Sequence, residues 1–312
     1  MAAESSLLES KRQVEYFELP ARSILNRTRA GMPFEWAINP YRGCEFGCRY
    51  CYARYTHEFM GMEDGREFEE KIYAKAHVAE LLRRDLRKVE RDHSIAIGTA
   101  TDPYQPAERR FGRTRAIFEV FNQGKGRRIS LITKSDLILR DLDLLTAVSR
   151  RNVLHINLTI TTLDTDLARA LEPLAPRPDL RIATVERLAQ AGINVGVNSN
   201  PIMPLITDSE ESLDRLAEAA ARAGASYFGG GLLFLMPSAQ KVFFPFLEEN
   251  FPHLTKRYRE RFEKNAYLRG PYQEMMRDRV KRIRARHRLT SSPAAYQPDL
   301  SSAGEQLELF PI

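Results

Sequence analysis

The segment NPYRGCEFGCRYCYARYTHEFMG, residues 39–61, contains every cysteine of the 312-residue chain. The three are Cys44, Cys48 and Cys51, in the spacing C-x3-C-x2-C. Thiolate is the usual protein ligand of iron–sulfur clusters. Three thiolates can hold three irons of a [4Fe–4S] cluster, which leaves the fourth iron open to a small molecule. We therefore predict such a cluster on these three residues.

Other uses of the three thiols fit the sequence less well. A zinc site would need a fourth ligand to complete a tetrahedron. The nearest candidate is His57, and its separation from Cys51 does not match a common zinc module. A disulfide would leave one cysteine over, and nothing marks the chain as secreted. The cluster is therefore the favoured interpretation, and zinc is the alternative.

At this spacing the segment resembles the radical SAM superfamily. In that family S-adenosylmethionine binds the open iron through its amino and carboxylate groups, so the resemblance implies this cofactor beside the cluster. Tyr50, directly before the last cysteine, matches the aromatic residue that the family places against the adenine. The resemblance further implies a radical SAM enzyme with an incomplete (β/α)6 barrel, which receives its electron from ferredoxin or flavodoxin.

Strand-like runs alternate with helix-like runs over the middle of the chain. The expected strands cover residues 36–40, 94–99, 128–133, 153–160, 193–199 and 227–235, and the expected helices cover residues 74–93, 115–123, 141–150, 181–191 and 209–223. Six strands separated by helices imply a parallel sheet with right-handed crossovers. Six units fit the incomplete barrel, and a doubly wound open sheet is the alternative. In either fold the site lies at the carboxyl ends of the strands.

Short polar segments follow several of the expected strands. TDPYQPAE follows the second strand and TKS ends the third and continues beyond it. With the cysteine segment, the LEP stretch before Arg181 and the AGI and NPIMP stretches, they resemble the radical SAM proteins related to spore photoproduct lyase, which reverses a thymine dimer. This resemblance places Thr101 and Lys134 at S-adenosylmethionine, with Lys134 paired to its carboxylate.

One polar position at each strand end is what a ligand pocket at a barrel mouth requires. We therefore also expect Asp102 and Asn198 to bind the cofactor, although each by itself also fits a turn or a helix cap. The lyase uses an additional cysteine to donate a hydrogen atom, and this chain has no fourth cysteine. Tyr104 is the candidate radical relay, and a packed aromatic residue is the alternative.

The chain divides into four parts on these patterns. An N-terminal extension over residues 1–33 precedes the partial barrel of residues 34–237. Residues 238–290 form a basic, helical C-terminal region. Residues 291–312 form a flexible linker, rich in Ser, Pro and Ala, and a terminal motif.

The net charge of +6 is concentrated near the C-terminus. Residues 255–288 contain 13 Lys and Arg against 4 Asp and Glu, so they carry +9 and the rest of the chain −3. Such a segment attracts polyanions, nucleic acid above all. Four aromatic residues lie among the basic ones, namely Tyr258, Phe262, Tyr267 and Tyr272, which favours nucleic acid further. The alternative is a solvated helix face.

The terminal motif resembles the peptide with which bacterial DNA polymerases and repair proteins dock on the sliding clamp. Gln306 would set the register, and Leu307, Leu309 and Phe310 supply the apolar part, while Glu308 stands where Ser or Asp is usual. Leu309 and Phe310 would enter a hydrophobic pocket of the clamp. The alternative is an apolar tail that packs on its own barrel.

We expect a cytoplasmic protein, because residues 1–12 lack a signal-peptide pattern and no apolar run is long enough for a membrane helix. The leading function is a radical SAM enzyme, lyase-like, that acts on a DNA lesion or modified base. One alternative is a radical SAM enzyme for a small molecule, a peptide or RNA. Another is a DNA-associated protein whose cluster is structural or senses redox state.

Overall fold

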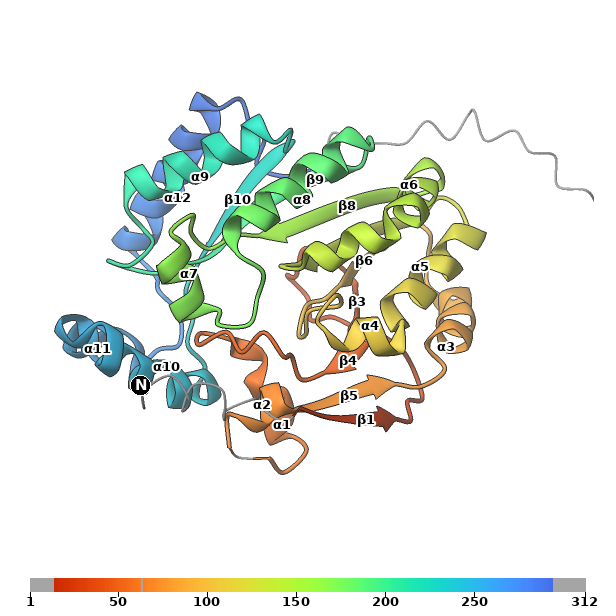
Figure 1. Ribbon diagram of the computed structural model, residues 1–312, viewed down its shortest axis with the longest axis horizontal. Helices are drawn as coiled ribbons and strands as arrows, with labels where there is room; N and C mark the ends of the chain where they lie inside the picture. Colours follow the sequence, from red (N-terminus) through yellow and green to blue (C-terminus); the bar gives the residue numbers. More distant parts are fainter. Residues whose placement is uncertain (1–13, 63, 294–312) are drawn as a thin grey trace, which may run out of the picture.

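The central feature of the computed structural model, which describes residues 14–62 and 64–293, is a sheet with six parallel strands (Figure 1). The strands lie side by side in chain order: β3 (Trp36–Ile38), β6 (Ser94–Ile97), β7 (Arg128–Thr133), β8 (Val153–Thr159), β9 (Asn194–Ile202) and β10 (Tyr227–Leu232). Each of the six expected strands is present. β2 (Leu25–Arg27) adds an antiparallel strand at the edge beside β3.

Helices in the crossovers cover the outer face of this sheet (Figure 1). They are α3 (Val78–Asp85), α5 (Arg113–Gln123), α6 (Leu142–Arg151), α8 (Pro178–Gln190) and α9 (Glu210–Arg222). Neighbouring helices pack on one another, α3 on α5, α5 on α6 and α8 on α9. A doubly wound sheet would reverse its strand order at a switch point, and this order runs in one direction. The expected fold class, an incomplete barrel of the radical SAM type, is confirmed.

Local sequence explains most of these elements. The strands are nearly continuous apolar runs because both of their faces are buried, as in Ile95, Ala96 and Ile97 of β6. α9 begins where the Ser209 hydroxyl accepts a hydrogen bond from the backbone N–H of Ser212.

A second, smaller sheet was not expected from the sequence. It joins β1 (Glu15–Leu19), β5 (Lys71–Lys75) and β4 (Tyr41–Arg42) in that order. The expected helix over residues 74–93 is therefore wrong at its start, because Ala74 and Lys75 end β5 and the helix begins at Val78. The helical spacing is correct for α3 and for the 3-10 turn Leu86–Lys88 that follows it, but residues 89–93 are not helical. The spacing also could not exclude a short strand that pairs with distant residues.

The C-terminal helices complete the molecule at the β10 edge of the large sheet. α10 (Pro237–Asn250) and α11 (Thr255–Phe262) pack beside the cysteine segment, and α12 (Pro271–Arg286) packs against β10 and α9. After α12 the chain returns to the sheet, where Thr290 forms a bridge with Tyr227. No helix among the described residues is long and apolar enough to cross a membrane.

Candidate functional site

A cavity of about 280 Å³ lies at the carboxyl ends of the parallel strands. All three cysteines line it, with residues that end or directly follow β6, β7, β8 and β9. These are Gly98, Thr99, Ala100, Thr101, Asp102, Thr133, Lys134, Thr159, Asn200 and Pro201. Because parallel strands end at the same edge, residues as far apart in the chain as Met32 and Phe234 meet around one space.

The backbone around the cysteines is held by buried contacts. Gly43 has φ +80°, and a Cβ there would lie 2.7 Å from the Lys71 carbonyl oxygen, so only glycine fits. Cys44 donates its backbone N–H to Phe68 O at 2.9 Å. The buried Arg54 donates to Cys48 O at 3.1 Å and to the Glu69 carboxylate at 2.7 Å. The loop therefore has a fixed shape before any cofactor binds.

The three thiols suit an iron–sulfur cluster better than a zinc ion. Among the described residues, their sulfurs do not all lie within 4.8 Å of one another. A tetrahedral zinc with Zn–S bonds of about 2.3 Å would hold its sulfurs about 3.8 Å apart, whereas a cluster binds each sulfur to a different iron. His57 does not line the cavity, and its Nε2 lies 3.1 Å from Lys71 O.

Burial also shapes the chemistry of these thiols. It raises the pKa of Cys44, of Cys51 and of Cys48, the last to about 12. Bare thiols in this cavity stay protonated and unreactive, and a cationic partner must displace the protons. The donor set thus fits a cluster of iron ions.

A buried charge network lies beside the cysteines. The Glu172 carboxylate is 2.6 Å from Nη1 of Arg181 and 3.9 Å from Nζ of Lys134. It accepts hydrogen bonds from the hydroxyls of Tyr50 and Thr161. Burial by itself would raise the pKa of Glu172, but Arg181 and Lys134 hold it below its ordinary value. Glu172 is therefore ionised, and it fixes the orientation of the Tyr50 ring.

Lys134 lies where a bound anion could reach it. Its ammonium group lies 5.8 Å from the centre of the Tyr50 ring, and Lys134 lines the cavity. The 3.9 Å separation from Glu172 is too long for a hydrogen bond. Its N–H donors can therefore pair with a carboxylate in the cavity.

Thr101 and Asp102 also line the cavity, and both tie its walls together. The Thr101 hydroxyl donates to Gly43 O at 2.6 Å, next to Cys44. The Asp102 carboxylate accepts from the Thr133 hydroxyl and from the backbone N–H of Lys134, both at 2.7 Å. These two residues join the cysteine segment to the ends of β6 and β7.

Two of the expected site residues are not brought to the cavity. Tyr104 is completely buried, and its hydroxyl donates to Asp141 at 3.2 Å. Asn198 lies deeper in the barrel, where its side chain donates to Asn157 at 3.2 Å, and Asn200 lines the cavity instead. Position along the chain could not show how far each side chain lies from the barrel mouth.

Sequence reasoning also missed the part that Glu172 plays. It occurs in a short LEP stretch, and nothing in that stretch shows that its carboxylate lies beside Tyr50. The apolar wall formed by Met32, Phe34, Leu233 and Phe234 was missed as well. No local pattern marks these residues, because two of them precede the first parallel strand, β3, and two follow the last, β10.

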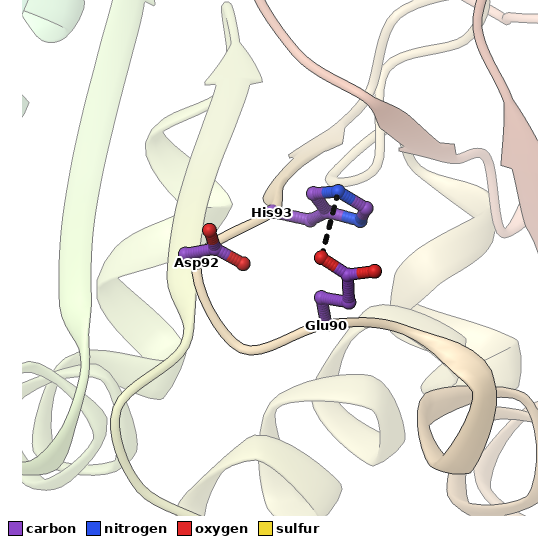
Figure 2. A group of neighbouring side chains, drawn as sticks. All are labelled: Glu90, Asp92 and His93. Atoms are coloured by element: carbon purple, nitrogen blue, oxygen red, sulfur yellow. Dashed lines mark ion pairs between the residues drawn. The ribbon is translucent and has the colours of Figure 1, made fainter.

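A group of acidic and imidazole side chains lies at the opposite end of the sheet, just before β6 (Figure 2). His93 Nε2 lies 3.6 Å from the Glu90 carboxylate, and His93 Nδ1 accepts from the indole N–H of Trp36 at 3.3 Å. Both ring nitrogens are engaged, and Glu90 and Asp92 are exposed. We assign no metal to this group.

Residues 38–220 match the sequence profile of the radical SAM superfamily. The chain belongs to this superfamily. An uncharacterized protein of Mycobacterium tuberculosis strain H37Rv, Rv2578c, is 34% identical over 293 residues, which cover 93% of this chain and 86% of the relative. An uncharacterized protein of Methanocaldococcus jannaschii is 29% identical, over 77% of this chain and 85% of the relative.

Solved structures of spore photoproduct lyase share the fold of this radical SAM protein. One of the lyase complexed with dinucleoside spore photoproduct has a TM-score of 0.64 at 14% identity, covering 87% of this chain and 79% of that chain. A variant with bound AdoMet and the same dinucleoside has a TM-score of 0.62 at 16% identity and the same coverage. As a radical SAM enzyme, the chain uses a [4Fe–4S] cluster and S-adenosylmethionine, together with a reductant and a substrate.

Proposed function

We propose that this radical SAM enzyme acts on nucleic acid, at a DNA lesion or a modified base, in a lyase-like reaction. The observation that carries the proposal is the position of the basic C-terminal region. α12, with six arginines and lysines in residues 271–286, packs against β10, the strand next to the cysteine cavity. The fold likeness to a lyase solved with a dinucleoside photoproduct supports the same substrate class.

In this proposal the chain's own residues hold and orient the cofactors. Cys44, Cys48 and Cys51 each bind one iron, and Lys134 pairs with the carboxylate of S-adenosylmethionine. The Tyr50 ring, fixed through Glu172, lies against the adenine. When bound, the cofactors supply a 5′-deoxyadenosyl radical that abstracts a hydrogen atom from the substrate.

Thr101 and Asp102 keep the wall of the cofactor pocket in place, through their bonds to Gly43 and to the end of β7. The apolar wall that includes Phe34 and Phe234 excludes water from the reacting atoms. Because the chain has three cysteines, a fourth thiol cannot return a hydrogen atom to the product. The electron comes from ferredoxin or flavodoxin.

The sliding clamp is a further proposed partner. The clamp-like residues Gln306, Leu307, Leu309 and Phe310 lie outside the described residues. The proposal for the clamp therefore rests on the sequence.

The test is anaerobic reconstitution with iron and sulfide, followed by reduction in the presence of S-adenosylmethionine. Oligonucleotides with and without ultraviolet lesions are added, and 5′-deoxyadenosine and altered nucleosides are measured by mass spectrometry. We expect both 5′-deoxyadenosine and a changed nucleoside to form with a damaged or modified oligonucleotide. Replacing Cys44, Cys48 or Cys51 by Ser removes the signal.

Two results would contradict the proposal in different ways. 5′-Deoxyadenosine that forms equally with and without any oligonucleotide, and no altered nucleoside, would point to a small-molecule or peptide substrate. A reconstituted cluster that never cleaves S-adenosylmethionine would point to a structural or redox-sensing role.

A further inference from the structure

A second cavity, also of about 280 Å³, lies between the end of β10 and α12. Its lining includes Leu233, Phe234, Tyr267, Arg277 and Arg284. Leu233 and Phe234 line the cysteine cavity as well, so the two spaces are neighbours that share a wall. A polymeric ligand with one unit in the second cavity would therefore place its next unit in the cysteine cavity.

Three aromatic rings run from the cysteine cavity into the second cavity. The ring of Tyr52, in the first cavity, lies 4.9 Å from the ring of Phe234. Phe234 in turn stacks on Tyr267, with centres 5.3 Å apart and an angle of 14°. Tyr267 is 49% exposed, although it is large and partly apolar. An exposed ring beside a cavity can stack on a planar ligand.

The cationic wall of the second cavity comes from one face of α12. Arg277 and Arg284 lie two turns apart on the same face, and both line the cavity. The lining contains no acidic residue, and no carboxylate among the described residues pairs with either arginine. Two arginines without a carboxylate, around one space, suit a phosphate.

Two other arginines of α12 form ion pairs with acidic residues of α9. Arg282 and Arg286 lie 3.6 Å from the Glu210 carboxylate, and Arg286 also lies 2.7 Å from Asp214. They attach α12 to α9, away from the cavity. The same helix thus has a neutralised face and a face with unpaired positive charge.

Two glycines at the end of β10, on the wall of the second cavity, are packed closely against neighbouring side chains. A Cβ on Gly231 would lie 2.9 Å from Oδ1 of Asn200, and one on Gly230 would lie 2.8 Å from Cδ1 of Ile202. Neither position can therefore take a larger residue without displacing Asn200 or Ile202.

We propose that the second cavity binds a nucleotide of a single-stranded or locally opened nucleic-acid substrate. Arg277 and Arg284 hold its phosphodiester, and its base stacks on Tyr267, while the adjoining nucleotide enters the cysteine cavity. This inference rests on the proposed function and names the subsite that it needs. A base within an intact duplex is stacked and paired and cannot insert into a cavity, so the nucleotide must be unpaired. An acidic peptide would satisfy the arginines but would offer no planar group to stack on the exposed part of the Tyr267 ring.

The test compares two double variants of the reconstituted full-length protein. Arg277→Gln/Arg284→Gln changes the cavity, and Arg282→Gln/Arg286→Gln removes the same charge from the other face of α12. Binding of a fluorescein-labelled oligothymidylate, roughly 12 nucleotides long, is followed by anisotropy over a range of salt concentrations. We expect the cavity variant to bind at least about ten-fold more weakly, with a salt slope shallower by about 0.7, the value for one lost phosphate contact on a single strand. The control variant keeps most of the affinity.

Tyr267 gives an independent measurement. Tyr267→Ala should weaken binding roughly ten-fold through the lost stack, and Tyr267→Phe should restore it because the ring is kept. Circular dichroism of each variant confirms that the fold is intact.

The possible failures are distinguishable. Equal losses in the two arginine variants mean diffuse attraction and overturn the subsite, as does unchanged binding in the cavity variant or in Tyr267→Ala. A polyglutamate competitor that displaces the oligonucleotide from wild type at comparable concentration would assign the cavity to acidic peptides. If wild type binds no oligonucleotide and makes no altered nucleoside, the proposed function fails as well. If wild type binds the oligonucleotide and makes an altered nucleoside, and the cavity variants behave like wild type, only the proposed subsite fails.

Discussion

Glu172 is the residue on which the buried part of the site depends most. Its carboxylate joins Arg181, Lys134 and Tyr50, which come from different elements. Removing one partner of a buried ion pair leaves the other charge without compensation. The burial of Glu172 and Arg181 to 1% exposure makes this cost large.

We expect Glu172→Gln to lower the free energy of unfolding by about 3 kcal/mol, because Arg181 stays buried without a counter-charge. The measurement is urea denaturation of the anaerobic protein at neutral pH. Asp179→Asn is the matched control, since it breaks an ion pair with Arg177 that is exposed on both sides, and it should leave the denaturation midpoint unchanged. Equal effects of the two variants would mean that the network around Glu172 is solvated.

The burial of Lys75, at the end of β5, should make the stability of the protein depend on pH. Burial, with a contribution from Arg42, lowers the pKa of Lys75 to about 8 in the folded protein, below its ordinary value of 10.5. The folded protein therefore releases this proton at lower pH than the unfolded chain does. The cost of burying the charge is fully present below pH 8 and is relieved as the pH rises from about 8 to 10.5.

Lys75→Met should therefore raise stability at pH 7 by on the order of 2 kcal/mol, and the gain should shrink above pH 8. Thermal unfolding of both proteins between pH 7 and about pH 10 gives the difference. A gain that stays constant over this range would show that Lys75 is charged in the folded protein throughout.

At the scale of elements, α12 both completes the core and presents charge. Met276, Val280 and Ile283 are buried in the main hydrophobic core, together with Phe228 of β10. The arginines lie on the remaining faces of the helix. The sequence segment that looks like a basic appendage is thus also the cover of the β10 edge, which would otherwise expose unpaired backbone groups.

We expect Ile283→Ala to destabilise the whole protein by about 2–5 kcal/mol, because it leaves a cavity at a fully buried position. The unfolding transition should remain single, since α12 shares its core with the barrel. Arg282→Ala, one residue away and exposed, is the control and should change stability little. A separate early transition that involves only the C-terminal helices would mean that they fold independently.

At the scale of the whole molecule, the proposed contacts with nucleic acid and with the sliding clamp are separable. The cavities lie within the described residues, and the clamp-like motif lies beyond them. Deleting residues 305–312 should abolish binding to the purified clamp, expected in the micromolar range at about −8 kcal/mol. Iron content and 5′-deoxyadenosine formation should stay the same. A truncated protein that still binds the clamp, or that loses its cluster, would contradict the clamp proposal.

The sequence by itself determined the class of the fold and its chemistry. Six apolar runs separated by helical periods predicted the six parallel strands, because period and run length are local properties of the backbone. The cysteine spacing predicted the position of the metal centre, because three thiols within eight residues must stay close in any fold. Thr101, Asp102 and Lys134 were placed at the cavity, because parallel strands all end at one edge.

Only the tertiary structure decided which side chains meet. Tyr104 follows the same strand as Thr101, yet only Thr101 lines the cavity, and the Tyr104 hydroxyl bonds to the buried Asp141 instead. The contact between Glu172 and Tyr50 joins residues more than a hundred positions apart. The contact between α12 and β10 joins residues about fifty positions apart. Such contacts depend on side-chain direction and on long-range packing. No local period records them, and so the buried network and the second cavity could not be predicted from the sequence.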